Sequence, residues 1–348
     1  MNTFAKSGYT SIKDIAKAAG VSHATVSRAL QSSDLVKPET AKRIREIAQQ
    51  FGYRPNAVGR SLATCRTQTI GVVVTTIADP IVAEMVSGVE AVARAHEYSV
   101  YLANCHADPE TEMQVVQSFH ERRVDGILVA ASRVGALYEP VMEEMRTPII
   151  LINNQHPSSY KYSVNIDSIP GSRAAVGHLI ELGHKAIAYI GDRFGYQTDL
   201  DRFSGYRQAL ELAGIVARQE WIVHGDGKIE GGTLAMRRLL DLDAMLSAVF
   251  CYNDMTAIGA LRAIHDRSLR VPGDISVAGF DDLFLASYTQ PPLTTVSQPK
   301  HQMGRLAAEL LLRILGGHDE DARTEVRGDL IVRASTAPPK KQGVHVHT

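Results

Sequence analysis

The sequence is poor in cysteine and lacks long apolar segments. Its only cysteines, Cys65, Cys105 and Cys251, are odd in number and form no CxxC pair, which argues against a disulfide framework and a structural zinc site. No apolar run approaches the roughly 18 residues of a membrane-spanning helix. The first thirty residues carry charges instead of the apolar core of a signal peptide. We therefore expect a protein of the reducing cytoplasm, with no membrane partner, metal or cofactor.

Common catalytic motifs are also missing. The chain contains no G-x-G-x-x-G, Walker A, H-E-x-x-H or G-x-S-x-G sequence. Asp281 and Asp282 resemble a carboxylate pair for glycoside chemistry. However, adjacent residues of a strand point to opposite faces of a sheet, so the two carboxylates cannot flank one bond. We predict that the protein is not an enzyme.

Charge is distributed unevenly along the chain, although the formal net charge is only -1. Residues 1–69 contain 11 Lys and Arg against 4 Asp and Glu, whereas residues 70–348 contain 26 against 34. A basic segment joined to an acidic body is typical of a nucleic-acid-binding module attached to another domain. The 348 residues are enough for about two or three domains.

Three short helices are predicted in the basic segment. Residues 11–19 place apolar side chains at helical spacing, and Gly20 follows as a typical helix terminator. Ser22 can cap a second helix over 23–30, and a third helix fits 38–51. Two short helices joined by a tight turn that contains glycine are a helix-turn-helix candidate.

The second of these helices has a polar side suited to DNA. It carries His23, Ala24, Thr25, Ser27 and Arg28. Arginine can bond guanine through two hydrogen bonds, and small hydroxyls can contact phosphates or bases in the major groove. The alternative is that His23 and Arg28 are simply solvated surface residues. The spacing, the caps and the charge together favour DNA reading.

A dense set of motifs covers the first seventy residues. It runs through TSIKDIAKAAGVSHATVSRAL and RIREIAQQFGYRPNAVGRSLATCRTQTIGVVV. These motifs resemble the amino-terminal signature of the lactose-repressor (LacI/GalR) family of transcription regulators. The resemblance implies base-reading roles for His23, Ala24 and Arg28. It implies phosphate-contacting or capping roles for Thr10, Ser22, Thr25, Ser27, Tyr53 and Asn56. Ala24 offers only a methyl group, so it can discriminate bases only through apolar contact, for instance with a thymine methyl.

The same resemblance identifies residues 56–63 (NAVGRSLA) with the family's hinge helix, which enters the minor groove. Leu62 matches the leucine that wedges into the central base step and kinks the duplex. So short a segment is too small for a stable isolated helix, and Gly59 weakens it by about 1 kcal/mol relative to alanine. We expect the hinge to fold only on DNA and beside a second copy.

From Ile70 onward, short apolar runs alternate with longer amphipathic segments, which predicts parallel sheets with helices on both faces. Two such sheets fit the remaining length better than one. The chain is expected to cross to the second half after Tyr162 and to cross back near LTTVSQP (293–299). The apolar runs are IGVVVTTI, SVYLANC, DGILVAAS, PIILINN, AIAYIG, WIVHGD, SAVFCYND and ISVAGFDD.

This layout and several recurrent motifs are similar to the core of the same family, which has a periplasmic-binding-protein-like fold of two doubly wound lobes joined by three crossing segments. The motifs include DRFSGYRQAL, AVFCYNDMTAIGALRA and SVAGFDD. We therefore predict an α/β protein with a helix-turn-helix domain at 1–55, a hinge helix and linker at 56–69, an effector-binding and dimerisation core at 70–337 and a disordered tail at 338–348. The first lobe is expected at about 70–162 and 297–323, and the second at about 163–296 and 324–337.

Polar residues follow several predicted strands, where open parallel sheets bind their ligands. They are Asp79, Asn153, Asn253 and Asp281. The family resemblance identifies Asp281 and Arg202 as effector-binding residues, and carboxylates and amides opposite an arginine suit the paired hydroxyls of a sugar. Asp and Asn at strand ends are also common helix caps, and Asp254 is expected to be one.

The sequence departs from sugar-binding members of the family after the strand WIVHGD. Many of them have an aromatic residue in that segment, where this chain has Gly227. Stacking on a sugar ring would then require another aromatic side chain, such as Phe194, Tyr196 or Phe284. The departure leaves open whether the effector is a sugar.

Together these features predict a DNA-binding transcriptional regulator of the repressor type. It is expected to bind a palindromic double-stranded DNA operator as a homodimer and to respond to a small-molecule effector, a sugar or sugar derivative. Two alternatives remain. A solute-binding protein without regulatory output leaves the basic segment unexplained, and an enzyme of carbohydrate metabolism lacks a catalytic motif. Binding of a palindromic duplex, set against turnover of sugars, discriminates among them.

Overall fold

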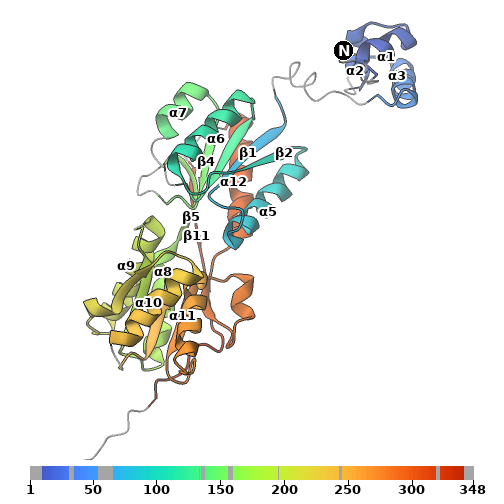
Figure 1. Ribbon diagram of the computed structural model, residues 1–348. Coiled ribbons are helices and arrows are strands. Elements are labelled where there is room, and N and C mark those ends of the chain that lie inside the picture. Colours follow the sequence, from blue (N-terminus) through green and yellow to red (C-terminus); the bar gives the residue numbers. More distant parts are fainter. Residues whose placement is uncertain are drawn as a thin grey trace, which may run out of the picture. The chain divides into compact units, whose positions relative to one another are not determined.

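The computed structural model describes residues 10–30, 35–53, 66–132, 134, 138–155, 160–194, 196–242, 245–318 and 322–340 (Figure 1). The chain divides into two compact units, Met1–Gln68 and Thr69–Thr348. Within the described residues, no helix is long and apolar enough to cross a membrane.

The first unit contains three helices, α1 (Ile12–Ala19), α2 (His23–Leu30) and α3 (Pro38–Gln50), as the sequence predicted. The side chain of Asp14 accepts a hydrogen bond from the backbone N–H of Ser11 and so helps to cap α1. Gly20 ends α1 in the left-handed conformation that favours glycine, with a φ of 63°. The helices enclose a small core with Ile15, Val26 and Ile44 at its centre.

The second unit contains two six-stranded sheets, which we call the first and second lobes with the helices that cover them. In the first lobe the strand order is β11-β5-β4-β3-β1-β2, and all neighbours are parallel. The strands are β1 (Thr69–Val74), β2 (Ser99–Asn104), β3 (Gly126–Ala130), β4 (Ile149–Ile152), β5 (Tyr162–Asp167) and β11 (Ala322–Arg327). The helices are α5 (Pro80–Ala95), α6 (Pro109–Glu121), α7 (Tyr138–Met145) and α12 (Lys300–Leu315).

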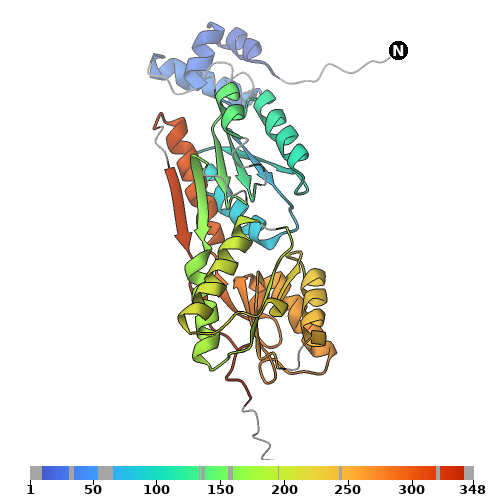
Figure 2. The same ribbon diagram turned by 90° about the vertical axis from the view of Figure 1, so that its left-hand side faces the viewer.

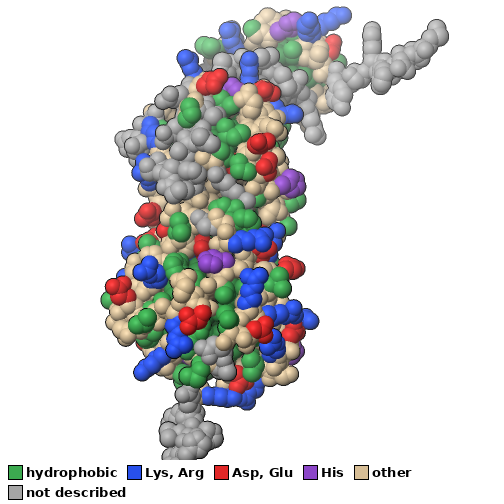
Figure 3. Space-filling model, turned by 60° about the vertical axis from the view of Figure 1, so that its left-hand side comes forward, with side chains coloured by type: hydrophobic (Ala, Val, Ile, Leu, Met, Phe, Trp, Pro, Cys, Tyr) green, Lys and Arg blue, Asp and Glu red, His purple; other side chains and the backbone are tan. Residues whose placement is uncertain are grey.

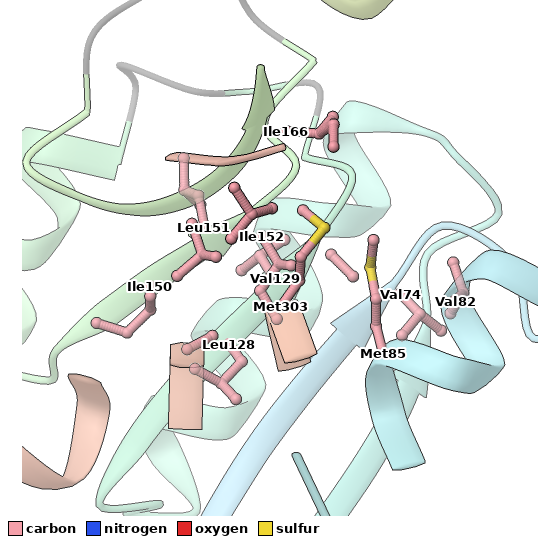
Figure 4. Packing of buried hydrophobic residues seen from close by; sticks show 14 of the residues in the cluster. Val74, Val82, Met85, Leu128, Val129, Ile150, Leu151, Ile152, Ile166 and Met303 are labelled. Atoms are coloured by element: carbon pink, nitrogen blue, oxygen red, sulfur yellow. The ribbon is translucent and has the colours of Figure 1, made fainter. Parts of the chain in front are cut away.

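The central strands of the first lobe are apolar throughout because helices cover both faces of the sheet. Figure 1 shows α5 and α12 on one face and α6 and α7 on the other. Met85 of α5 and Met303 of α12 meet strand residues such as Val129 and Ile152 in the packed interior (Figure 4).

The second lobe has the strand order β12-β10-β9-β8-β6-β7 and is parallel except for β12, which is antiparallel to β10. Its strands are β6 (Ile187–Asp192), β7 (Ile222–Gly225), β8 (Ala248–Cys251), β9 (Ser276–Asp281), β10 (Thr294–Ser297) and β12 (Leu330–Ile331). Its helices are α8 (Ser168–Glu181), α9 (Gln197–Leu212), α10 (Ile229–Leu242) and α11 (Asp254–Asp266), with short 3-10 turns at Gln219–Trp221 and Phe284–Ser287.

The chain passes between the lobes at three places: after Asp167, between Ser297 and Lys300, and between Arg327 and Leu330. The first and third crossings lie later than the expected limits at 162 and 323. The reason is that β5 and β11 pair with each other along their whole length in the first lobe (Figure 2). Polar residues such as Ser163 and Asn165 interrupt the apolar pattern of β5, so the sequence marked its beginning as a boundary.

Candidate functional site

The polar side of α2 is exposed at three of its five positions, while Thr25 and Ser27 are half-buried. His23, Ala24 and Arg28 are exposed, whereas Val26 and Ala29 are buried in the core of the first unit. The helix therefore presents one cationic side chain and one imidazole on the surface opposite its packed face. A helix that presents such side chains is suited to the major groove of DNA.

The flanking candidates have local structural partners. The hydroxyl of Ser22 accepts a hydrogen bond from the backbone N–H of Thr25 and so caps α2. Thr10 donates its hydroxyl hydrogen to the carbonyl oxygen of Phe51 and ties the start of α1 to the end of α3. Ser27 and Tyr53 are half-buried. Asn56, Leu62 and the expected hinge helix at 56–63 lie outside the described residues.

The second candidate site has a buried ion pair at its centre. Arg202 of α9 is 2% exposed and Asp281, the last residue of β9, is fully buried. One guanidinium nitrogen of Arg202 lies 3.0 Å from Oδ1 of Asp281, and another donates to the carbonyl oxygen of Tyr252 at 2.6 Å. The guanidinium also stacks over the ring of Phe280, 3.8 Å from its centroid. The structure thus joins the two residues that the family resemblance singled out.

Three polar atoms around this pair are buried without a hydrogen-bond partner in the described part of the chain. They are Oδ2 of Asp281, Nε of Arg202 and Oε1 of Gln298. Buried polar atoms without partners are rare in folded proteins and cost free energy. One carboxylate oxygen, one guanidinium N–H and one amide oxygen are thus unused within the described residues. A ligand that reached them would have to supply hydrogen-bond donors to the oxygens and an acceptor to the nitrogen.

The site is rich in buried acid. Asp254 is fully buried, and its two carboxylate oxygens accept hydrogen bonds from the hydroxyl of Thr295 and the backbone N–H of Leu283. Burial raises the pKa of Asp254, and the neighbouring charge of Asp281 raises it further. Burial also raises the pKa of Asp281, against the opposing effect of Arg202. Uncompensated negative charge is therefore costly here.

One expectation about this segment is wrong. Asp254 was expected to cap α11, but the N-cap is Asn253, whose side-chain oxygen accepts from the backbone N–H of Thr256 at 2.8 Å. The Nδ2 group of Asn253 donates to the carbonyl oxygen of Gly227. Both ends of the Asn253 amide are thus used within the protein, so its main contribution is to shape the site.

Two candidates of the first lobe follow strands β1 and β4. Asp79 caps α5 by accepting from the backbone N–H of Ile81, and its charge raises the pKa of Asp281, so it lies close to the ion pair. Asn153 is buried with a left-handed φ of 53°, and its carbonyl oxygen accepts from the side chain of Gln155.

A polar connection that the sequence did not reveal joins the two lobes beside the ion pair. The hydroxyl of Thr198 in α9 donates to Oε1 of Gln155 at 2.7 Å and lies 2.9 Å from the hydroxyl of Tyr252. The backbone N–H of Gln197 also donates to the carbonyl oxygen of Gln155. Gln155 follows a strand of the first lobe, so a search for polar residues two or three positions beyond strand ends would have found it.

The aromatic candidates differ in environment. Phe194 is half exposed and stacks on Tyr196 with ring centroids 5.6 Å apart, and Phe284 is mostly exposed. Gly227 has a φ of 71°, a conformation that disfavours any other residue. Its carbonyl is held by Asn253, so the loop cannot readily present an aromatic side chain from this position.

Comparison with known proteins adds family matches in both units. Residues 11–56 match the family described as bacterial regulatory proteins, lacI family, and residues 176–336 match a periplasmic binding protein-like domain. The chain is 36% identical over 329 residues to the HTH-type transcriptional regulator RegA of Clostridium saccharobutylicum, covering 94% of this chain and 99% of RegA. It is 36% identical over 328 residues to the HTH-type transcriptional repressor CytR of Escherichia coli K12, covering 93% and 96%.

Solved structures give similar matches. The lac repressor dimer bound to operator and the anti-inducer ONPF has a TM-score of 0.86 at 26% identity, with coverage of 94% of this chain and 99% of that chain. A complex of the transcriptional regulator CelR with cellobiose has a TM-score of 0.72 at 31% identity, with the same coverage. These relatives are named as transcriptional regulators and repressors and not as enzymes, in agreement with the missing catalytic motifs.

Proposed function

Because the chain belongs to the lacI family of bacterial regulatory proteins and is a transcriptional regulator, we propose that it is a cytoplasmic repressor. In this proposal it binds a palindromic operator as a homodimer, and it responds to an uncharged, hydroxyl-rich effector. The observation that carries the effector half of this proposal is the buried Arg202–Asp281 pair with its unused polar atoms.

The DNA half rests on the exposed side of α2. Arg28 is free to approach a guanine edge and His23 a neighbouring base, while buried Val26 fixes the helix on its core. The lac repressor, whose structure this chain resembles, was solved as a dimer on its operator. A dimer places two copies of α2 on half-sites about one helical turn apart, or a multiple of that distance.

Surface features support self-association. Strand β2 is an edge of the first sheet, and its side chains Tyr101 and Leu102 are about half exposed. In the second lobe, α10 exposes Leu234 and Leu242. An open edge strand with apolar side chains needs a cover, and a second copy of the chain is a natural one. On the face that Figure 3 shows, acidic and basic side chains are interspersed over the second unit.

The effector is proposed to be uncharged because the cations described around the ion pair already have partners: the ammonium group of Lys300, for example, donates to the backbone carbonyls of Asp281 and Asp282. Arg202 is already paired with Asp281, and buried Asp254 adds a further acid. A phosphate or carboxylate would lie close to these acids without a partner, which is costly in a buried site. Neighbouring hydroxyls, by contrast, can donate to Oδ2 of Asp281 and accept from Nε of Arg202. Sugars and the ribose of nucleosides both carry this arrangement.

Regulation requires only that the effector bind one arrangement of the lobes more tightly than another. Coupling between sites in such proteins is typically about 1–3 kcal/mol, and it is reciprocal: an effector that weakens operator binding is itself bound more weakly on the operator. The contacts of Gln155 with Thr198 and Gln197 are interlobe contacts that such a change would alter.

A thermal-shift screen tests the effector half. The panel comprises neutral sugars, including cellobiose and ribose, the matching sugar phosphates, and nucleosides with their free bases. We expect a neutral hydroxyl-rich compound to raise the melting temperature by mass action and to change operator affinity. The matching phosphate should be weaker, and Asp281→Asn should abolish the shift. Stabilisation by the phosphorylated compounds alone would contradict an uncharged effector.

A further inference from the structure

The turn that carries Asp281 has an unfavourable backbone. Asp281 has a φ of 112° and Asp282 a φ of 50°, and neither is glycine. Such conformations persist only when surrounding contacts hold them. Arg202 bonds to the carboxylate of Asp281, and the backbone N–H of Gln298 donates to the carbonyl oxygen of the same residue. Three further side chains hold the turn: Arg333 donates to the carboxylate of Asp282, the hydroxyl of Thr295 accepts from the backbone N–H of Asp282, and Lys300 donates to the backbone carbonyls of both aspartates.

Lys300 differs from the other two because it belongs to a helix of the first lobe. Its side chain is 4% exposed, and its Nζ lies 2.7 Å from the carbonyl oxygen of Asp281 and 3.0 Å from that of Asp282. The same Nζ lies 3.6 Å from Oε1 of Glu84, on α5. One ammonium group therefore contacts the ligand-site turn of the second lobe and a helix of the first.

Local helix energetics do not account for a lysine at this position. Lys300 is the first residue of α12, where the positive end of the helix dipole disfavours a cation. Burying an ammonium group also costs free energy unless it is fully hydrogen-bonded. The residue is accommodated because two carbonyl oxygens and one carboxylate surround it, and all three belong to other elements.

The helix that begins with Lys300 is in close contact with α5. A Cβ atom added at Gly304 of α12 would lie 1.9 Å from the carbonyl oxygen of Met85, and one added at Gly88 of α5 would lie 2.1 Å from that of His301. The two backbones thus approach each other closely at a glycine on each helix, so α5 and α12 are packed directly against each other. Met85 and Met303 extend this contact into the core of the first lobe (Figure 4).

We propose that Lys300 is a positioning residue that links the effector-site turn at Asp281 and Asp282 to α5 of the first lobe. A ligand that moves this turn displaces the ammonium group, and with it the start of α12 and the side of α5 that carries Glu84. The signalling role rests on the proposed effector function. The mechanical link itself belongs to the ligand-free protein and can be tested there.

A purely local role is the competing explanation, in which Lys300 only holds the turn. Arg333 provides the matched control, because it holds the same turn through Asp282 and the carbonyl oxygen of Leu293, both within the second lobe. On α5, Glu90 provides the control for Glu84, because its carboxylate pairs with Arg94 of the same exposed helix face.

Hydrogen exchange of the ligand-free full-length protein, read by mass spectrometry in peptides covering 80–95 and 276–288, separates the two roles. Glu84→Gln keeps Lys300 in place, and we expect it to accelerate exchange at the turn about two- to fivefold, the range for loss of a partly exposed ion pair. Glu90→Gln should leave exchange at the turn unchanged.

A second pair of variants compares Lys300 with Arg333. Lys300→Met should accelerate exchange in both peptides, whereas Arg333→Met should accelerate exchange only in 276–288. Lys300→Arg should restore most of the protection.

The link is refuted if Glu84→Gln changes exchange only within α5, or if Lys300→Met and Arg333→Met give the same pattern. These outcomes are independent of the effector screen, because no ligand is added. Failure of that screen would remove the proposed signal but not the link, and equal exchange patterns would remove the link but not the effector.

Discussion

The two units present their functional side chains in opposite ways. In the first unit, α2 carries exposed His23 and Arg28 on a helix fixed by a small core. In the second unit, Arg202 and Asp281 are buried, bonded to each other and surrounded by further polar groups. The residues proposed to read DNA lie on the surface, whereas the residues proposed to bind the effector are part of the interior.

This difference affects how each site responds to substitution. An exposed cation can be removed with little effect on stability, because water replaces its interactions. Removal of one member of a buried ion pair leaves the other as an uncompensated charge. Function and stability should therefore separate cleanly in the first unit and only partly in the second.

The largest effect is expected from Asp281→Ala. It leaves the guanidinium of Arg202 buried without its carboxylate, so we expect the free energy of unfolding of the second unit to fall by about 3–5 kcal/mol. Urea unfolding followed by circular dichroism measures this change. Asp241→Ala, which removes a mostly exposed partner of Arg267, should cost less than about 1 kcal/mol. Equal effects of the two variants would contradict the buried role of the pair.

Arg28→Ala should have the opposite pattern, with a large effect on operator affinity and a small effect on stability. We expect operator affinity to fall by about 1–3 kcal/mol and one base preference to relax, because a bidentate contact to guanine is lost. The unfolding free energy should stay within about 0.5 kcal/mol of the starting protein. Fluorescence anisotropy with labelled duplexes measures the affinity, and unchanged binding would remove α2 from the groove.

The pH dependence of stability probes the buried acid beside the ion pair. The pKa of Asp254 is raised in the folded protein, so the folded state binds the proton more tightly than the unfolded state. Its contribution to stability is therefore present at low pH and is lost as the pH rises above 3.8, the ordinary value, through the raised pKa. Burial lowers the pKa of His184, which contributes with the opposite sign.

The variant Asp254→Asn isolates the first contribution. The stability of this variant relative to the starting protein should increase with pH, by at most about 1.4 kcal/mol per pH unit for one proton. Urea unfolding at a series of pH values between 4 and about 8 measures the difference. A difference that is independent of pH would show that Asp254 titrates equally in both states.

Deletion of the first unit is expected to have the smallest effect on the stability of the second unit. A chain comprising residues 69–348 should keep the unfolding midpoint of the second unit and its effector-induced thermal shift, because the two units are separately compact. It should lose operator binding completely. Aggregation of this fragment, or loss of the thermal shift, would show that the second unit depends on the first.

The sequence predicted the helices of the first unit well because their signals are local. Ser22 and Gly20 mark a helix start and a helix end, and apolar spacing marks the packed face. The strands of the second unit were equally visible as apolar runs. The contacts of Lys300 and Gln155 were not predictable, because each joins elements that are distant in the chain. The position of Gln155 just beyond a strand end could have made it a candidate, but not revealed its partners.

The wrong prediction that Asp254 caps α11 has a different cause from the missed contacts of Lys300 and Gln155. Both residue types cap helices, and they are adjacent, so the sequence could not decide between them. The backbone decides: Asn253 has an extended conformation, with φ of -148° and ψ of 174°, and Asp254 is already helical. Its carboxylate is thereby directed to Thr295 and Leu283 beside the ion pair.

The central claim, that an exposed DNA-reading unit is joined to a buried effector site, is tested most directly by selection of duplexes from a random pool with the full-length protein at about 0.15 M salt, where nonspecific phosphate contacts are weakened. The account predicts that duplexes with an inverted repeat are enriched. It also predicts that the affinity for the enriched duplex changes when a compound that stabilises the second unit is added. Recovery of duplexes without any shared sequence, or binding that no such compound alters, would contradict it.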